Sequence, residues 1–200
     1  MMIGRRKKNE ADLTDGPAEE QKLPFGYEAY TWLHDVVSCL AVVMVLFVFF
    51  LRLIGVSGPS MTPTLLNGDR VILLSNFLYR EVDAGDIVVM QIPSFDTEPI
   101  VKRVIATGGQ TVDIDFEAGE VYVDGVLLQE DYINELTHLS YVDGPTFPVT
   151  VPDGCLFVMG DNRNDSADSR YGPIGMVDAR RVLGRVMTIV WPAARFGMVS

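Results

Sequence analysis

The feature that most constrains this chain is one uncharged apolar run near its N-terminal end. The run extends from Val36 to Leu51 and is dense in Val, Leu and Phe. Extended to Ile54 it is about 19 residues long and as a helix spans about 28 Å, close to the thickness of a bilayer's hydrocarbon core. Such a run is more typical of a membrane span than of a core helix. We therefore expect a transmembrane helix over residues 36–54.

A cleavable signal peptide would also place an apolar run near the N-terminus, but this run does not fit that pattern. It begins behind a long polar leader, exceeds the usual length of a signal-peptide core, and is not followed by a clean small-x-small cleavage site. Within the leader, residues 1–24 combine Gly, Pro and mixed charge, a composition typical of disorder. We therefore expect an uncleaved anchor after a largely disordered tail, residues 1–35.

The charges of the chain bear on its orientation and its partners. A basic cluster at residues 5–8 favours a cytoplasmic N-terminus, but it lies far from the span, and the charges beside the span do not decide. The net charge of −11 argues against a nucleic-acid partner, because such binding depends on basic patches. Cysteine and histidine residues form no cluster with metal-site spacing, so we expect no metal and no cofactor.

The sequence after the span consists of short β-like segments separated by turns. Asp124-Gly125, between two apolar triplets, predicts a β-hairpin. Amphipathic helical periodicity is scarce, so we expect a mostly β fold: one β-rich domain over residues 55–200, long enough to bury its own core. The segments expected as strands are rich in Val, Ile and aromatic residues and cover residues 70–74, 86–90, 100–105, 111–114, 120–123, 155–159 and 183–191.

The segment Ser-Gly-Pro-Ser-Met-Thr-Pro-Thr-Leu, residues 57–65, follows the predicted span closely. Gly58 and two prolines fix an irregular backbone around Ser60, a condition for presenting a hydroxyl from a loop. A Pro-rich linker leaving the membrane would have similar features, so this segment alone does not identify Ser60 as a nucleophile.

A second segment places Lys102 and Arg103 inside an apolar strand. A buried ammonium group must either find a partner or lose its proton, so a lysine here is unusual. The alternative is that one of the two side chains points outward and is solvated, and this segment alone favours that alternative.

A third segment, residues 160–172, is a polar run rich in Asp, Asn and Arg that follows a predicted strand. It would also suit a solvated loop or a calcium-binding loop. The calcium-binding hypothesis is disfavoured, because the segment lacks the closing Glu of an EF-hand and its arginines would oppose a cation.

Together these segments resemble type I signal peptidases, specifically the bacterial kind that pairs serine with lysine. The order of motifs carries the resemblance: the anchor, Ser-Met-x-Pro-Thr-Leu from Ser60, Gly-Asp-Ile-Val from Gly85, Lys-Arg-Val-Ile from Lys102, and Gly-Asp-Asn-Arg…Ser-x-Asp-Ser-Arg from Gly160. The motifs extend over nearly the whole chain. Lysine at position 102 distinguishes it from the archaeal and endoplasmic-reticulum relatives, which have histidine there.

The resemblance implies a Ser/Lys dyad that forms an acyl-enzyme. Ser60 attacks the scissile carbonyl and Lys102 takes its proton, so the pKa of the lysine must lie well below its ordinary value of about 10.4. Ser166 matches the family's second serine, which hydrogen-bonds to the lysine and orients it. Support for the loop that carries Ser166 is expected from two ion pairs, Asp161 with Arg103 and Asp168 with Arg170.

Two departures from the family pattern bear on the site. Some members have a hydroxyl-bearing residue two positions before the nucleophile as an oxyanion donor, whereas this chain has Gly58, as many Gram-positive members do. The Ser60 backbone N–H is then the first donor, with backbone groups near Gly58 or a water as candidates for the second. In addition, residues 106–110 read Ala-Thr-Gly-Gly-Gln where the family usually has Gly-x-Pro-Gly-Asp.

The substrates implied by the resemblance are exported preproteins with small residues at positions −1 and −3. Shallow pockets lined by Val56, Met61, Leu65 and Val101 are expected to accept alanine and exclude larger side chains. Cleavage after translocation would place residues 55–200 outside a bacterial cell membrane and residues 1–35 in the cytoplasm. The expected partners are therefore the preproteins and the lipid bilayer, with the Sec and Tat export machinery involved indirectly.

Two alternatives stay open at this stage. Self-cleaving repressors share the Ser/Lys dyad and a β fold, but the membrane span and the lack of a helix-turn-helix oppose that identity. A catalytically idle, anchored paralogue is supported only by the altered sequence at residues 108–110. The retained Ser60, Lys102, Ser166 and Asp168 argue against it.

Overall fold

The computed structural model describes residues 25–78 and 81–199, in two compact units that divide after Ala41. The predicted disorder of residues 1–24 falls outside the described residues. The first unit contains most of one long helix, and the second contains two β-sheets.

The long helix α1 covers Phe25–Phe49, and its segment Gly26–Phe49 is long and apolar enough to cross a membrane. The expected bounds, residues 36–54, are wrong at both ends. The helix begins earlier because no proline or charged run interrupts residues 25–35. It ends earlier because Leu51–Gly55 forms strand β1, whose backbone pairs with β2 from Leu51↔Leu74 to Gly55↔Arg70.

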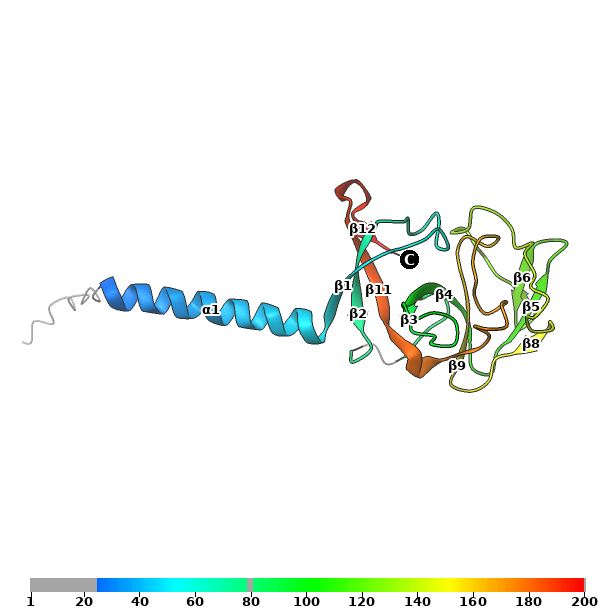
Figure 1. Ribbon diagram of the computed structural model, residues 1–200, viewed down its shortest axis with the longest axis horizontal. Helices are drawn as coiled ribbons and strands as arrows, with labels where there is room; N and C mark the ends of the chain where they lie inside the picture. Colours follow the sequence, from blue (N-terminus) through cyan, green and yellow to red (C-terminus); the bar gives the residue numbers. More distant parts are fainter. Residues whose placement is uncertain (1–24, 79–80, 200) are drawn as a thin grey trace, which may run out of the picture. The chain divides into compact units, whose positions relative to one another are not determined.

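The larger sheet has eight strands, in the order β1-β2-β11-β3-β4-β9-β10, with β12 paired to β11. All of its pairings are antiparallel, and β4 lies between β3 and β9 near the middle of the sheet (Figure 1). Its strands are β1 (Leu51–Gly55), β2 (Arg70–Ser75), β3 (Ile87–Met90), β4 (Ile100–Thr107), β9 (Cys155–Met159), β10 (Val177–Asp178), β11 (Val182–Trp191) and β12 (Gly197–Met198).

The smaller sheet has four strands, in the order β7-β6-β5-β8. Its strands are β5 (Thr111–Asp115), β6 (Glu120–Val123), β7 (Val126–Leu127) and β8 (Val149–Thr150). β6 and β7 form the hairpin expected at Asp124-Gly125, where both residues have positive φ, 52° and 77°, as a tight type I′ turn requires. The mostly β fold is confirmed, and each of the seven segments expected as strands contains one.

The hydrophobic core consists of three clusters of buried side chains. One cluster fixes the segment between β1 and β2, which contains Ser60. Val56, Met61 and Leu65 of this segment pack against β2 and β11 residues such as Val71 and Val186. Burying apolar side chains on both sides of Ser60 fixes the path of the segment in between.

Candidate active site

Ser60 lies in the loop of residues 56–69 between β1 and β2, called the Ser60 loop below. Its two ends are joined, since Val56 N donates to Asp69 O at 2.8 Å and Gly68 N donates to Val56 O at 2.9 Å. Gly58 has a φ of 88°, in the left-handed region that favours glycine, so a larger residue would be strained at this position. The loop is therefore closed at its base and sharply bent just before Ser60.

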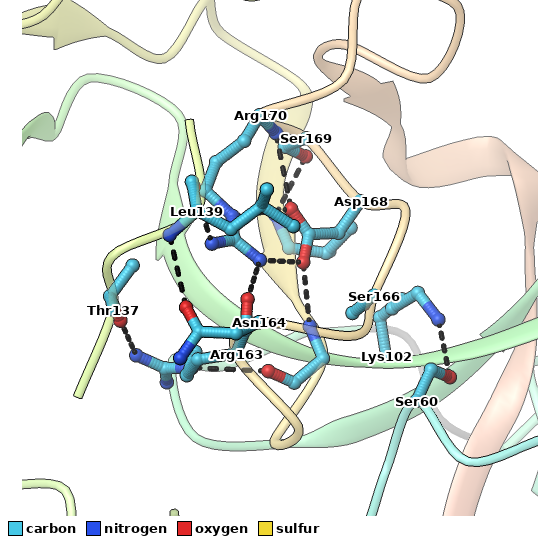
Figure 2. Close-up of polar contacts among 12 residues, drawn as sticks. Ser60, Lys102, Thr137, Leu139, Arg163, Asn164, Ser166, Asp168, Ser169 and Arg170 are labelled. Atoms are coloured by element: carbon cyan, nitrogen blue, oxygen red, sulfur yellow. Dashed lines mark hydrogen bonds and ion pairs between the residues drawn. The ribbon is translucent and has the colours of Figure 1, made fainter. Parts of the chain in front are cut away.

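Lys102 lies on β4 and directs its side chain at Ser60. Lys102 Nζ donates to Ser60 Oγ at 2.7 Å (Figure 2). Lys102 is 4% exposed and its neighbour Arg103 is 2% exposed, so the alternative in which one of them faces solvent is wrong. A bulge in the β4–β9 pairing after Val104 accompanies this departure from simple alternation.

Burial sets the protonation of Lys102. Desolvation lowers the pKa of Lys102 from its ordinary value of 10.5 to about 8, while the carboxylates of Asp168 and Asp161 oppose this and the Arg170 cation adds to it. A substantial fraction of the amine is therefore neutral in mildly alkaline solution. A neutral amine 2.7 Å from a hydroxyl can accept its proton, which is the geometry required of a nucleophile and its general base.

Asp161 connects β4 to the Ser60 loop. Arg103 forms a two-pronged ion pair with it, Nε to Oδ1 and Nη2 to Oδ2, both at 2.8 Å, with both side chains buried. Asp161 Oδ2 also accepts a short hydrogen bond from Thr64 Oγ1 in the Ser60 loop. The expected Asp161–Arg103 pair is therefore formed, and it fixes the loop as well as the strand.

Asn162 holds the nucleophile residue directly, and sequence reasoning assigned it no role. Its N–H donates to Ser60 O at 3.0 Å, and its side-chain amide donates to Pro59 O at 3.2 Å. Its place in the Gly-Asp-Asn-Arg motif was the available signal. The loop after β9 therefore contacts the backbone on both sides of the Pro59–Ser60 peptide bond.

The expected pair of Asp168 and Arg170 is also formed. Arg170 Nε and Nη2 each lie 2.8 Å from a carboxylate oxygen of Asp168, and both side chains are fully buried. Asp168 Oδ2 accepts from Gly160 N at 3.0 Å, and Arg170 Nη2 donates to Arg163 O at 2.7 Å. These bonds close the polar loop upon itself (Figure 2).

Ser166 lies in this loop, but its expected hydrogen bond to Lys102 is not formed. Ser166 is 3% exposed, and its Oγ has no hydrogen-bond partner among the described residues. The Lys102 amine bonds instead to Ser60. A Cβ added to Gly160 would lie 2.2 Å from Ser166 Oγ and 2.4 Å from Ser60 O, so only glycine allows Ser166 and Ser60 to approach from both sides.

Arg163 is a further buried residue that sequence reasoning did not single out. Its Nη1 donates to Glu130 Oε2 at 2.8 Å, and its Nε donates to Gly160 O at 3.0 Å. Nearby, the guanidinium group of Arg103 stacks on the ring of Tyr132, with Arg103 Cζ 3.8 Å from the ring centroid. Glu130 and Tyr132 lie in the segment between β7 and β8. This segment therefore contacts both Arg163 of the polar loop and Arg103 of the Arg103–Asp161 pair.

A groove of about 490 Å³ opens beside the Ser60–Lys102 pair. Of the four residues expected to contact substrate, Val56, Met61 and Val101 line it. Leu65 does not, because it is completely buried in the core cluster beneath the loop. The apolar lining that the sequence did not reveal comes from several strands and consists of Ile54, Leu73, Val89, Ile100 and Leu183.

The Ser60 backbone N–H was expected as the first oxyanion donor, with backbone groups near Gly58 or a water as the second. The Ser60 N–H makes no hydrogen bond within the described part of the chain and is available. The Gly58 N–H is engaged, since it donates to Asn67 Oδ1 at 3.2 Å. Residues 25–78 and 81–199 contain no group of three His, Cys, Asp or Glu side chains able to hold a metal.

The fold and the site place a serine hydroxyl against a buried lysine amine in a mostly β domain, and comparison with known proteins identifies the chain's family. A family model described as signal peptidase, peptidase S26, matches residues 29–191. The chain is 37% identical over 153 residues to a probable signal peptidase I-1 of Synechocystis, which covers 72% of this chain and 74% of the relative. It is 31% identical over 169 residues to the signal peptidase I of Bacillus licheniformis, covering 82% and 89%. The chain therefore belongs to the signal peptidase I family of serine peptidases, and the resemblance noted from its motifs is confirmed.

One solved structure is also similar, a crystal structure of a signal peptidase I from Enterococcus faecalis. It shares 31% sequence identity, covers 52% of this chain and 96% of its own, and has a TM-score of 0.44.

Proposed function

We propose that this chain removes N-terminal signal peptides from exported preproteins, with Ser60 as nucleophile and Lys102 as general base. The observation that carries the proposal is the 2.7 Å contact between Lys102 Nζ and Ser60 Oγ, made by a lysine that burial deprotonates readily. A solvated lysine would hold its proton at neutral pH and could not act as a base.

The proposed reaction has two stages. Ser60 Oγ attacks the scissile carbonyl carbon while its proton passes to Lys102 Nζ, and the lysine then protonates the leaving amine of the mature protein. An ester between Ser60 and the signal peptide is left. Water attacks this ester, Lys102 takes the water's proton, and Ser60 regains its proton as the signal peptide leaves as a free acid.

In each stage the substrate carbonyl oxygen becomes negatively charged, and we assign the hydrogen bond that stabilises this oxyanion to the Ser60 N–H. This group makes no hydrogen bond to another described residue and belongs to the attacking residue, which makes it the first candidate to bind the oxygen that develops charge. Removing a donor from an oxyanion site typically costs about 10²–10³ in rate. The Gly58 N–H can serve as a second donor only if it gives up Asn67.

Preference for small residues at positions −1 and −3 is assigned to the groove. The walls nearest the dyad are Val56, Met61 and Val101, two of them branched residues that are held in the core and cannot easily move aside. An alanine side chain fits against such walls, whereas a larger side chain overlaps with them.

Anchoring and topology complete the proposal. Helix α1 is placed across a bacterial cell membrane, residues before it in the cytoplasm, and the catalytic domain on the outer side, where a translocated preprotein presents its cleavage site. Preproteins then arrive from the Sec and Tat export machinery without a contact between that machinery and this chain. Ser60 follows the end of the helix, Phe49, by 11 positions (60 − 49), and the 5 residues of β1 lie between them.

Incubation of the detergent-solubilised chain with a preprotein tests the proposed function. The wild-type chain is expected to yield the mature protein, with a new N-terminus directly after a small residue, and Ser60→Ala is expected to yield none. Absence of cleavage by the wild-type chain would instead favour an idle, anchored paralogue. Cleavage of the chain by itself, with the preprotein left intact, would favour a self-cleaving protein.

A further inference from the structure

Arg195 lies near the C-terminal end of the chain, in the short 3-10 helix η2 (Ala193–Arg195), yet its side chain reaches the Ser60 loop. Its Nη2 donates to Thr64 O at 2.8 Å and lies 3.4 Å from Pro63 O. Its Nη1 lies 3.2 Å from Asp69 Oδ2. One guanidinium group therefore contacts three residues of the Ser60 loop.

Asp69, the acidic partner of Arg195, holds the base of the Ser60 loop together. Its carboxylate Oδ2 accepts from Leu66 N at 2.8 Å, and its backbone oxygen accepts from Val56 N, also at 2.8 Å. The Asp69 side chain is 3% exposed, so its charge needs a partner inside the protein. The Arg195 cation meets that need.

Thr64, the other partner of Arg195, is coupled to Ser60 through the turns between them. Leu65 N donates to Met61 O at 2.9 Å, and Thr62 N donates to Pro59 O at 3.0 Å, so overlapping turns link Thr64 to Ser60. The position of Thr64 therefore bears on the position of Ser60.

The Ser60 loop is thus held from two directions. Asp161 and Asn162, in the loop after β9, bind Thr64 Oγ1 and the backbone oxygens of Pro59 and Ser60. Arg195, from the opposite end of the sequence, binds the backbone oxygen of Thr64 and the Asp69 carboxylate. The first set is part of the motif that suggested the family, whereas Arg195 lies beyond residues 29–191, which the family model matches.

We propose that Arg195 is a positioning residue for the nucleophile: it holds the Ser60 loop in the position in which Ser60 Oγ contacts Lys102 Nζ. Arg195 does not line the groove beside the dyad, so it acts through the loop and not on the substrate. The proposal rests on the proposed function, and it assigns Arg195 to the chemical step. Substrate binding should depend on it very little.

Kinetics of purified full-length variants with a preprotein test this role. Because small misplacements of a reacting group reduce the rate steeply, Arg195→Ala is expected to lower kcat by about 10- to 100-fold. Its KM is expected to stay within about twofold of wild type, as for a residue that acts only after binding. The kcat of Arg195→Lys is expected to lie between those of wild type and Arg195→Ala. An ammonium group can pair with Asp69, but it lacks the forked guanidinium that also reaches Thr64 O. Arg180→Ala is the matched control, since Arg180 is highly exposed and its ion pair is with Asp178, away from the Ser60 loop.

Thermal unfolding of each variant separates positioning from general stability. The expected result is a loss of kcat, measured well below the Tm, that persists in a fully folded Arg195→Ala protein. If Arg195→Ala does not fold, the kcat of folded Arg195→Lys decides. A kcat equal to that of Arg180→Ala in the folded variants, or an increase in KM alone, would overturn the proposal. Lack of cleavage by the wild-type chain would instead overturn the proposed function.

Discussion

Lys102 Nζ lies 2.7 Å from Ser60 Oγ, although the two residues belong to different elements and are 42 positions apart (102 − 60). Lys102 is held by the central strand β4, and Ser60 by a loop that packs Val56, Met61 and Leu65 into the core and is bound on one side by Asn162. The contact therefore depends on the whole domain and not on a local turn. In the proposed mechanism both residues act in one proton-transfer step.

Substitution of either member of the dyad is expected to abolish preprotein cleavage. Ser60→Ala removes the nucleophile and Lys102→Ala removes the base, and residues that act as a unit do not add their effects. The double variant is therefore expected to be little worse than either single variant in a cleavage assay. Ser140→Ala, at an exposed serine that does not line the groove, is the control and should keep most of the activity. Substantial residual cleavage by Lys102→Ala would remove the lysine from the mechanism.

The buried lysine is expected to destabilise the fold. A pKa lowered from 10.5 to about 8 corresponds to about 3 kcal/mol of lost ammonium stabilisation. Below pH 8 this cost is fully present. Between about pH 8 and 10.5 the unfolded chain binds a proton that the folded chain does not, so the free energy of unfolding rises with pH through that window. Above it both states are neutral and the cost is gone.

Lys102→Met tests this cost, because methionine has a similar length and no charge. At pH 7 the variant is expected to have a higher Tm than wild type and a free energy of unfolding larger by up to about 3 kcal/mol. At pH 10.5 both differences are expected to be much smaller. Ser60→Ala, which keeps the ammonium and removes its hydroxyl partner, is not expected to raise the Tm. If Lys102→Met is less stable than wild type at both pH values, the lysine is not a desolvated base.

The groove predicts which residues control substrate size. Val101→Ala enlarges the wall beside the dyad, so it is expected to increase cleavage of a preprotein with valine at −1 relative to one with alanine at −1. Leu65→Ala is the matched control: it removes a fully buried side chain that does not line the groove. That variant is expected to lose about 2–5 kcal/mol of stability without a change in the valine-to-alanine ratio. A changed ratio in Leu65→Ala alone would place the pocket elsewhere.

Topology provides a prediction that is independent of kinetics. Protease added to intact spheroplasts is expected to cut exposed turns of the catalytic domain, such as the hairpin at Asp124-Gly125 or the loop at Val142, which is fully exposed. An epitope tag placed before residue 25 should stay protected until the membrane is broken. Accessibility of the tag together with protection of the domain would contradict the proposed orientation.

Much of the β fold could be predicted from the sequence, because its signals are local. Segments rich in Val, Ile and aromatic residues and separated by turns predicted the strands, and Asp-Gly predicted the β6–β7 hairpin from the backbone angles that its turn requires. The end of the helix could not be predicted, since Leu51–Gly55 is apolar enough for either structure. Its pairing with β2, a contact made through the backbone of distant residues, decides in favour of a strand.

The site shows the same division. The residue types and their order predicted a Ser60–Lys102 pair and the two ion pairs, and the structure brings the members of each pair into contact. Leu65 was misassigned, since sequence position gives no sign of which side of a loop faces the core. Arg195 and Asn162 were missed for a related reason: they act through hydrogen bonds to backbone oxygens, which no residue pattern in the Ser60 loop reveals.

The central claim is that Lys102 is the general base, and the pH dependence of kcat/KM for preprotein cleavage tests it most directly. This quantity reports the ionisation of the free enzyme. It is expected to rise about tenfold per pH unit at acidic and neutral pH and to level off above an apparent pKa of about 8, the value that burial gives Lys102. Lys102→Arg, which cannot deprotonate, is expected to be inactive at every pH. A profile that is flat from pH 6 to pH 10 would contradict the account.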